Sequence, residues 1–315
     1  MAITFGKETT AEAVAAAADL SGKTVVITGA TGGLGEESAA VLAQRGAFVI
    51  ITGRTAKKSA EAVGRILKRV PDARLQSVEM ELSEPDSVRA AAARIVQLAP
   101  RIEILINNAG LMAPPLSRNS LGWESQFAGN HMGHFILTAL LAPAIVAARQ
   151  ARIVNLSSSA HQFSGIDFQD PQFNQRDYHP YIAYGQSKTA NILFTVSLAT
   201  KLKSRGVTAY AVMPGAVGTP LFKHVGGPQR LEGANIFVKS IPQGAATQVW
   251  AATAPEFAEN TGRYLEDCGL AQVNDDPNSV ALFGYRSPSM HMETAERLWQ
   301  LSESLSGQPF KIPAQ

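Results

Sequence analysis

The sequence predicts an α/β protein, a single domain in which one doubly wound parallel sheet lies between two layers of helices. Short apolar runs alternate with helical stretches from residue 23 to residue 212. Most of the runs are apolar at consecutive positions rather than at every second position, as in parallel strands that are buried on both faces. The segments between them are long enough for right-handed crossovers. A length of 315 residues fits one large domain of this class.

The elements follow in order from local signals. Aliphatic and β-branched residues predict strands at 23–28, 47–52, 75–80, 103–106, 152–156 and 207–212. Apolar residues at helical spacing predict helices at 34–45, 56–69, 83–98, 120–148 and 181–202. Pro71 ends the second helix, Ser83 is predicted to cap the third, and Pro143 is predicted to bend the fourth. Repeated strand–helix–strand units of this kind form a Rossmann-type three-layer sandwich.

The domain organisation is predicted to be simple. Residues 1–20 are expected to form an N-terminal extension with one surface helix, and residues 21–315 a single domain without an internal linker. Two loops, at about 159–183 and 218–242, follow the carboxyl ends of strands. Because ligands of such sheets bind at that edge, these loops are predicted to cover a substrate.

Composition excludes several classes of protein. A net charge of +2 provides no basic surface for nucleic acid. The single cysteine, Cys268, excludes an intramolecular disulfide framework and a cysteine-based zinc site. His131 and His134 are three residues apart, but no third ligand recurs nearby, so no metal is predicted. The Ala-rich N-terminus does not have the pattern of a signal peptide, and the longest apolar run, 135–148, is too short to span a bilayer. A cytoplasmic protein without a membrane partner is expected.

A glycine-rich turn joins the first predicted strand to the first helix. Its sequence, TGATGGLG at 28–35, lets backbone approach a pyrophosphate, and the N-terminus of the following helix favours the negative charge. An ordinary glycine-rich turn is the alternative. A Walker-type phosphate loop is excluded because no Lys-Ser or Lys-Thr follows the last glycine.

The turn resembles that of the short-chain dehydrogenase/reductase family, whose pattern is TGxxxGxG. It also fits TGxxGxxG, the pattern of the extended branch of epimerases and dehydratases. Asn107-Asn108-Ala109-Gly110, at the end of the fourth strand, resembles the NNAG signature of the non-extended branch. The chain is therefore identified as resembling the non-extended branch, over residues 23–219.

Tyr184 and Lys188 stand four residues apart on a predicted helix, so that their side chains share one face. A free phenol has a pKa of about 10, and a neighbouring ammonium is expected to favour the phenolate. An aromatic core residue and a surface lysine at helical spacing are the alternative. The resemblance assigns both residues to catalysis, because the glycine turn, the NNAG segment and a serine precede them.

The resemblance also implies two further catalytic residues. Ser158, the second serine after the fifth strand, is expected to hold the substrate oxygen near Tyr184. Its neighbours Ser157 and Ser159 are expected to bond the backbone of the turn. Asn130 matches the family's mid-helix asparagine, which braces a water that connects the lysine to solvent.

The cofactor-binding residues implied by the resemblance come from the glycine turn, the ends of the next strands, the catalytic helix and the PGxVxT-like segment 214–219. They are Gly29, Thr31, Gly33, Leu34, Gly35, Arg54, Glu81, Leu82, Asn108, Ala109, Gly110, Tyr184, Lys188, Pro214, Gly215, Val217 and Thr219. Glu81 departs from the family's usual aspartate at the adenine contact.

The end of the second strand predicts the choice of cofactor. An NAD-selective site needs a carboxylate there for the ribose 2′-hydroxyl, and the position is Gly53. Arg54 follows, with Lys57 and Lys58 close behind it, and no nearby acid is expected to repel a phosphate. A guanidinium suits a 2′-phosphate, to which Thr31 could add a hydroxyl. NADP(H) is therefore predicted over NAD(H), with a merely solvated Arg54 as the alternative.

The resemblance implies hydride transfer between NADP(H) and a carbonyl or secondary alcohol. Two alternatives are a nucleotide-sensing protein without turnover and an extended-branch epimerase or dehydratase. Within the family, segments such as 154–161 are most like the retinol-dehydrogenase and WW-domain-oxidoreductase group. A homodimer or homotetramer is expected, because the helices that hold Asn130 and Tyr184 often form dimers in the family. An aromatic lining favours a lipophilic small molecule, and its candidates are Phe163, Phe168, Tyr178, Tyr181, Leu221 and Phe222.

Overall fold

The central feature is a mostly parallel sheet. The computed structural model describes residues 4–227, 229, 236–257, 260–277, 279 and 283–312. Within them eight strands pair in the order β10-β9-β6-β5-β4-β1-β2-β3. Their bounds are β1 (Thr24–Ile27), β2 (Phe48–Gly53), β3 (Arg74–Glu79), β4 (Ile104–Asn107), β5 (Arg152–Leu156), β6 (Thr208–Met213), β9 (Arg263–Glu266) and β10 (Gly269–Leu270). Residues 228 and 230–235 of the predicted loop 218–242 lie outside the described residues.

The predicted fold class is confirmed. β1 lies between β2 and β4, parallel to both, with Val26 opposite Ile50 on one side and Leu105 on the other. These three side chains are fully buried, as their unbroken apolar runs require. The strand order reverses direction between β1 and β4, which is the point where such sheets bind their ligands. Only the short edge strand β10 is antiparallel to its neighbour.

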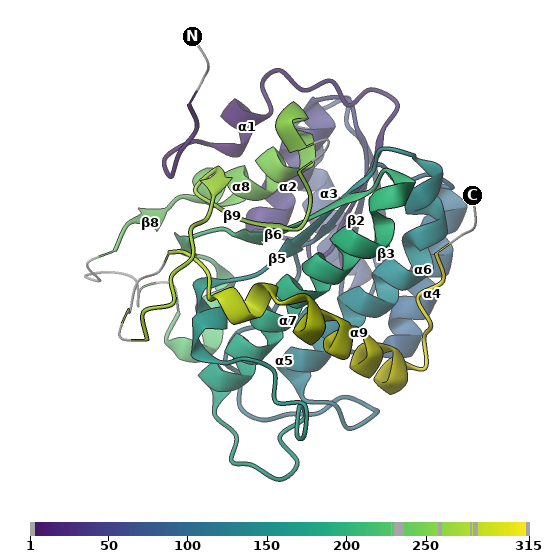
Figure 1. The fold of residues 1–315 in the computed structure, drawn as a ribbon. Helices are drawn as coiled ribbons and strands as arrows, with labels where there is room; N and C mark the ends of the chain where they lie inside the picture. Colours follow the sequence, from purple (N-terminus) through teal and green to yellow (C-terminus); the bar gives the residue numbers. More distant parts are fainter. Residues whose placement is uncertain are drawn as a thin grey trace.

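Helices cover both faces of the sheet (Figure 1). α2, α3 and α8 enclose one core with the sheet, and α4, α6 and α7 enclose the other, with α9 packed outside α7. Their bounds are α1 (Ala11–Val14), α2 (Gly33–Gln44), α3 (Ala56–Arg69), α4 (Pro85–Leu98), α5 (Ser125–Phe127), α6 (Gly133–Ala147), α7 (Pro180–Leu202), α8 (Ile241–Thr253) and α9 (Met292–Ser306).

The predicted helix 120–148 is shorter and interrupted. The Asn119 side chain accepts from two backbone amides of the following turn, which keeps residues 120–123 out of the helix. The helix begins after Glu124, whose carboxylate accepts from the amides of residues 126 and 127 at 2.9 and 2.8 Å. A π-helical turn, Ala128–Met132, separates α5 from α6, and α6 continues through Pro143. The predicted Ser83 cap is wrong, because Glu84 occupies the N-cap position of α4 and Pro85 begins the helix.

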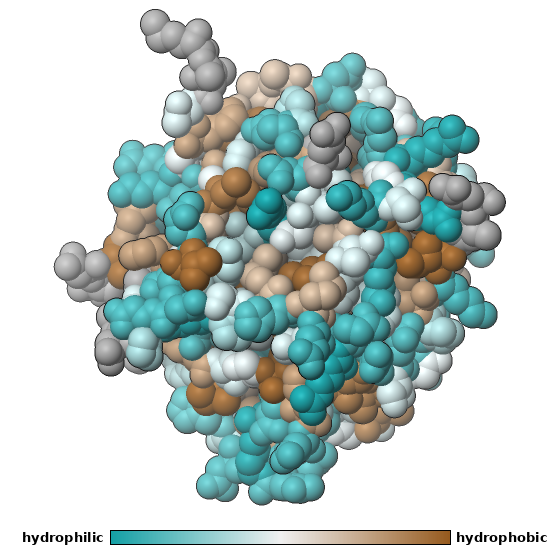
Figure 2. Space-filling model, viewed as in Figure 1, coloured by the Kyte–Doolittle hydropathy of each residue, from teal (hydrophilic) through white to brown (hydrophobic). Residues whose placement is uncertain are grey.

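The stretch Ser125–Ala147 is long and apolar enough to cross a membrane by length and composition. However, 78% of its most apolar window is buried inside the protein, as in a core helix. On the face drawn in Figure 2, hydrophobic side chains lie in separate groups among hydrophilic ones.

Both ends of the chain add to the core in ways the sequence did not reveal. The N-terminal helix α1 has four residues and lies at the surface with Glu12 and Ala13 exposed, while Ala11, Val14 and Ala15 are buried against α8. At the other end, β9, β10 and α9 complete the sheet and one helical layer.

The C-terminal helix α9 covers α7, one of the two helices on which the dimer prediction rests. Trp299 of α9 packs against Phe194 of α7 and Phe135 of α6, with ring centroids 5.9 and 5.3 Å apart. Every residue of α7 from Ala183 to Ala199 is buried within the single chain. α6, by contrast, keeps Pro143 and Ala147 exposed. The homodimer or homotetramer therefore stays a prediction.

Candidate active site

The glycine turn and the Asn107–Gly110 segment meet where the sheet order reverses. The Thr28 hydroxyl, at the end of β1, accepts from the amides of Asn108 and Ala109, both at 2.9 Å. The Asn108 amide group donates to the Thr28 carbonyl at 2.8 Å. Gly29 has a positive φ of 66°, and a Cβ there would lie 2.8 Å from that of Ala109. The two segments thus fix each other's backbone at the carboxyl edge of the sheet.

The start of α2 is suited to an anion. Its N-cap residue, Gly32, provides no side-chain cap, whereas Thr55 and Ser240 cap α3 and α8 with their hydroxyl groups. The first amides of α2 therefore remain free to donate to an external group, and the helix dipole favours a negative one. This arrangement fits the pyrophosphate of a dinucleotide.

The segment 214–219 closes over this turn. The Thr219 methyl group would lie 3.6 Å from a Cβ at Gly33. Val217 and Leu34 both pack against the same face of Gly244 in α8, within 2.8 Å of where its Cβ would stand. Val217 lies in β7 (Ala216–Val217), which pairs with β8 (Val238–Lys239). The ends of the predicted substrate loop are therefore held together beside the glycine turn.

Tyr184, Ser158 and Lys188 come together as predicted. Ser158 follows the end of β5. Its hydroxyl accepts from the Ala160 amide at 3.2 Å and acts on the Tyr184 phenol to lower the pKa of that phenol. The Lys188 Nζ lies 5.6 Å from the centre of the Tyr184 ring and donates to the Leu156 carbonyl at 3.2 Å. Ser157 turns away and donates to the Lys188 carbonyl at 2.9 Å, which is the backbone role expected of it.

The electrostatics of this group differ from the expectation. Burial raises the pKa of Tyr184 to about 12, and the hydrogen bond with Ser158 acts in the opposite direction. Burial also lowers the pKa of Lys188 to about 8. Because Lys188 is itself desolvated, the protein alone keeps Tyr184 as a phenol rather than favouring the phenolate. A protonated phenol is the form that donates a proton to an oxygen.

Asn130 lies in the π-helical turn and is fully buried. Its side-chain oxygen accepts from the Leu111 amide at 2.8 Å, and its amide group donates to the Leu111 carbonyl and the Ser187 hydroxyl at 3.0 and 2.9 Å. A Cβ at Gly110 would lie 3.3 Å from Asn130 Oδ1 and 3.4 Å from Lys188 Nζ. Asn130 therefore ties the segment after β4 to α7, the helix that carries Tyr184 and Lys188.

His134, which was not predicted to belong to the site, connects Asn130 to Thr28 at the glycine turn. Its Nδ1 bonds the Asn130 carbonyl at 2.9 Å and its Nε2 bonds the Thr28 hydroxyl at 2.8 Å. A carbonyl only accepts, so Nδ1 carries the hydrogen and Nε2 accepts from Thr28. Burial lowers the pKa of His134 to about 4, which keeps the ring neutral. Its spacing from Asn130, four residues on a helix, was the available signal.

The predicted 2′-phosphate site is partly as expected. Arg54 is exposed and makes no hydrogen bond or ion pair to another described residue. A Cβ at Gly53 would stand 2.3 Å from the Thr31 methyl group and 2.6 Å from the Ser59 hydroxyl, so an acid has no room there. However, Glu79 of the adjacent strand is paired with Gly53, and its carboxylate accepts from the Ala56 amide at 2.9 Å. The expectation of no nearby acid is therefore wrong, because strand pairing brings Glu79 from another part of the chain.

The remaining predicted cofactor residues occupy different environments. Glu81 uses one carboxylate oxygen to accept from the amide and hydroxyl of Ser83 at 3.2 and 2.9 Å. The Leu82 side chain is buried in the core beneath α6. A Cβ at Gly215 would lie 2.9 Å from the Lys239 side chain, and Lys239 forms a 2.6 Å ion pair with Asp267.

An apolar cluster surrounds Tyr184. Of the predicted lining, Tyr181, Leu221 and Phe222 belong to it, together with the unpredicted Met112, Ala113, Ala160 and Val225. Three predicted lining residues lie elsewhere: Phe163 is 55% exposed, Phe168 packs under Arg297, and Tyr178 donates to the Pro114 carbonyl at 3.0 Å. The four unpredicted residues come from separate parts of the chain, and no local sequence pattern marks them as lining the site.

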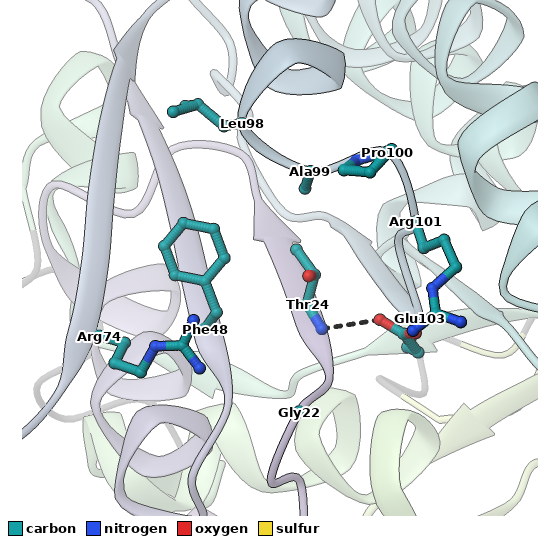
Figure 3. Close-up of a pocket in the computed structure, with 9 residues that line it drawn as sticks. All are labelled: Gly22, Thr24, Phe48, Arg74, Leu98, Ala99, Pro100, Arg101 and Glu103. Carbon is teal, nitrogen blue, oxygen red and sulfur yellow. Dashed lines mark hydrogen bonds between the residues drawn. The ribbon is translucent and has the colours of Figure 1, made fainter.

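Two other features lie outside this site. A cavity of about 260 Å³ at the amino ends of β1, β2 and β3 is lined by Gly22, Thr24, Phe48, Arg74, Leu98, Ala99, Pro100, Arg101 and Glu103 (Figure 3). It lies at the opposite edge of the sheet from Tyr184, away from where such folds bind substrates.

Among the described residues, no three His, Cys, Asp or Glu side chains are grouped to hold a metal ion.

Comparisons with known proteins agree with this geometry. The sequence model of the short chain dehydrogenase family matches residues 23–229. Retinol dehydrogenase 12 of Mus musculus is 40% identical over 291 residues, which cover 91% of this chain and 87% of the relative. The chloroplastic short-chain dehydrogenase TIC 32 A of Brassica napus is 39% identical over 314 residues, which cover 96% and 94%. A crystal structure of an uncharacterized protein from Mycobacterium paratuberculosis matches with a TM-score of 0.73 and 32% identity, over 94% of this chain and 98% of that one.

The match to the family model covers most of the chain, and the relatives match it almost end to end. The nearly all-parallel sheet and the glycine turn at its reversal point are the structural counterparts of that match. The chain therefore belongs to the short-chain dehydrogenase family, is related to its retinol dehydrogenases, and is an NAD(P)-dependent oxidoreductase that acts on alcohol or carbonyl groups.

Proposed function

We propose that this protein reduces lipophilic aldehydes or ketones, and oxidises the corresponding alcohols, with a preference for NADP(H). The observation that carries the proposal is the surroundings of Tyr184. Its phenol is affected by the Ser158 hydroxyl, its ring lies over the buried Lys188, and it belongs to an apolar cluster with Leu221 and Phe222. Such a site suits an oxygen at the end of an apolar body. Several relatives are named for retinol, an alcohol of this kind.

The roles of the residues follow from this arrangement. The bound cofactor supplies a hydride to the carbonyl carbon in reduction and accepts one in oxidation. In reduction Tyr184 gives its phenolic proton to the substrate oxygen, so that the carbonyl becomes an alcohol. Ser158 donates a hydrogen bond to the same oxygen and holds it beside Tyr184. Lys188, directly beneath the ring, stabilises the phenolate that remains until it is reprotonated.

The preference for NADP(H) is supported by Arg54 and Gly53. Arg54 is exposed and available to a 2′-phosphate, and the packing of Thr31 and Ser59 excludes an acidic side chain at position 53. Glu79 opposes this preference, but its carboxylate is already bound to the amide at the start of α3. A guanidinium that is free to form a charge-assisted pair outweighs a carboxylate that is already engaged.

The test is a panel of aldehydes and ketones of increasing chain length, with retinal among them, assayed with NADPH and with NADH. We expect consumption of NADPH to exceed that of NADH, and kcat/KM to rise with the length of the apolar body. Cofactor binding without turnover of any compound would indicate a nucleotide-sensing protein instead. A product with the mass of the substrate, and no net change in cofactor, would indicate an epimerase.

A further inference from the structure

A buried histidine lies directly behind the catalytic serine and has no role in the function proposed above. His161 ends the segment 154–161 and lies in the short 3-10 turn Ser159–Phe163. It is 3% exposed, and its ring packs on that of Tyr264 in β9 with centroids 5.2 Å apart. Packing alone accounts for the ring but does not account for the partners of its two nitrogen atoms.

Both nitrogen atoms of His161 are engaged by backbone groups. Nδ1 lies 2.7 Å from the Ser158 carbonyl, which also accepts from the His161 amide at 3.1 Å. Because a carbonyl only accepts, Nδ1 carries the hydrogen and Nε2 is an acceptor. Nε2 accepts from the amide of Arg286 at 3.2 Å. The ring is therefore a neutral bridge between the peptide of Ser158 and the C-terminal part of the chain.

Arg286, whose amide donates to His161, lies in the C-terminal segment 283–287 and makes further hydrogen bonds that hold this segment in place. Its guanidinium donates to the carbonyls of Asn274 and Asp276 at 2.8 and 2.6 Å. The amide of Gly284 donates to the Glu266 carboxylate at the end of β9 at 2.9 Å. The segment that carries Arg286 thus lies at the carboxyl edge of the sheet, where the substrate is expected.

We propose that His161 is a positioning residue, which fixes the peptide of Ser158 through Nδ1 and couples it through Nε2 to the segment that carries Arg286. The proposal rests on the function proposed for Ser158. The orientation of the Ser158 hydroxyl toward Tyr184 depends on the Ser158 backbone, and His161 supplies two of the donors that hold its carbonyl. Movement of the Arg286 segment therefore reaches the catalytic serine through one imidazole ring.

Two substitutions separate the two halves of the bridge. In His161→Asn the amide takes the place of Nδ1 and still donates to Ser158, whereas in His161→Gln it takes the place of Nε2 and still accepts from Arg286. The assay uses NADPH and the carbonyl compound of the panel that the wild-type enzyme reduces fastest. We expect His161→Asn to keep most of kcat and to raise KM. We expect His161→Gln to lower kcat about 10- to 100-fold, because a small displacement of Ser158 is enough.

A matched control comes from the same turn. Gln162 donates to the Phe283 carbonyl at 3.2 Å, so Gln162→Ala removes another tie to the same segment without touching Ser158. We expect this variant to keep the wild-type kcat, and the dissociation constant for NADPH to be the same in all of these variants. The double variant Ser158→Ala/His161→Gln should have the kcat of Ser158→Ala alone, because His161 acts through that serine.

The outcomes distinguish the two proposals. Equal losses of kcat in His161→Asn and His161→Gln, or a further loss in the double variant, overturn the positioning role and leave only packing. A Ser158→Ala variant with the wild-type kcat contradicts the proposed function itself. An inactive Ser158→Ala with a fully active His161→Gln contradicts the role of His161 alone.

Discussion

Tyr184 shows what can and cannot be predicted about a single residue. Its identity as a catalytic candidate followed from the spacing to Lys188 and from the motifs that precede it. The direction of its pKa did not, because burial dominates and raises the pKa to about 12. Desolvation depends on elements that are far away in the sequence, such as the loop that carries Leu221 and Phe222.

Replacing Tyr184 by phenylalanine tests its proton-transfer role. The ring still packs, and only the proton donor is lost. We expect kcat to fall about 100-fold or more, the usual contribution of general acid catalysis, while NADPH binding is retained. The measurements are kcat and the dissociation constant for NADPH. Tyr181→Phe, in the same apolar cluster, is the control, and a Tyr184→Phe variant as active as this control removes Tyr184 from proton transfer.

Arg54 and Glu79 are expected to have opposite effects on the binding of NADPH. We expect Arg54→Ala to weaken NADPH binding about ten- to a hundred-fold, because one charge-assisted hydrogen bond contributes about 1.5–3 kcal/mol. NADH binding should change little. Glu79→Gln keeps an acceptor for the Ala56 amide but loses the charge, so it should strengthen NADPH binding. Titration of both variants with both cofactors tests this, and an equal loss of NADPH and NADH in Arg54→Ala contradicts the assignment.

At the level of elements, the prediction succeeded where the local signals were strong. β1 to β6 lie within one residue of their predicted bounds, because all but the largely polar β3 are mainly apolar runs that end at a helix start or turn signal. No element was assigned after β6. β9 has only four residues and charged ends, and it is a strand because it pairs with β6. The π-helical turn before α6 has no local signal either. Its residue Asn130 is hydrogen-bonded to Leu111 and Ser187, which lie far from it in the sequence.

The start of α6 lies unusually close to the loop after β3. A Cβ at Gly133 would stand 2.0 Å from the Leu82 carbonyl oxygen. We expect Gly133→Ala to lower the free energy of unfolding by about 1–3 kcal/mol, the usual cost of overpacking. Gly64, exposed in the middle of α3 with nothing within 4 Å, is the matched control, and Gly64→Ala should raise stability by about 0.5–1 kcal/mol. Urea unfolding measures both, and a neutral Gly133→Ala argues against the close contact.

His134 links α6 to the glycine turn and makes this link dependent on pH. Its pKa is 6.5 when exposed and about 4 in the folded protein. Between these values the unfolded chain binds a proton that the folded chain does not, so the free energy of unfolding falls as the pH is lowered through this window. We expect the difference between wild type and His134→Asn to shrink by about 1.4 kcal/mol per pH unit there. Urea unfolding at several pH values tests this, and parallel curves contradict it.

For the whole molecule, the two cores on either side of one sheet followed from the unbroken apolar strands. The way the second core is closed did not, because the amphipathic α9 could not be assigned a partner from sequence. Its position shows that Trp299 and Phe310 complete the packing around Phe135. Local sequence patterns thus predict the order of strands and helices up to β6. Which side of α7 is covered depends on α9, whose packing no local pattern predicts.

Because α9 packs on α7, the helix that carries Tyr184 and Lys188 is buried without a second subunit. The residues that surround Tyr184 all come from this one chain. We expect a specific activity that stays constant when the enzyme is diluted from micromolar to nanomolar concentration, whether light scattering gives a particle of 33.5 kDa or the predicted dimer or tetramer. A specific activity that falls on dilution and recovers on concentration would show that a partner copy is needed after all.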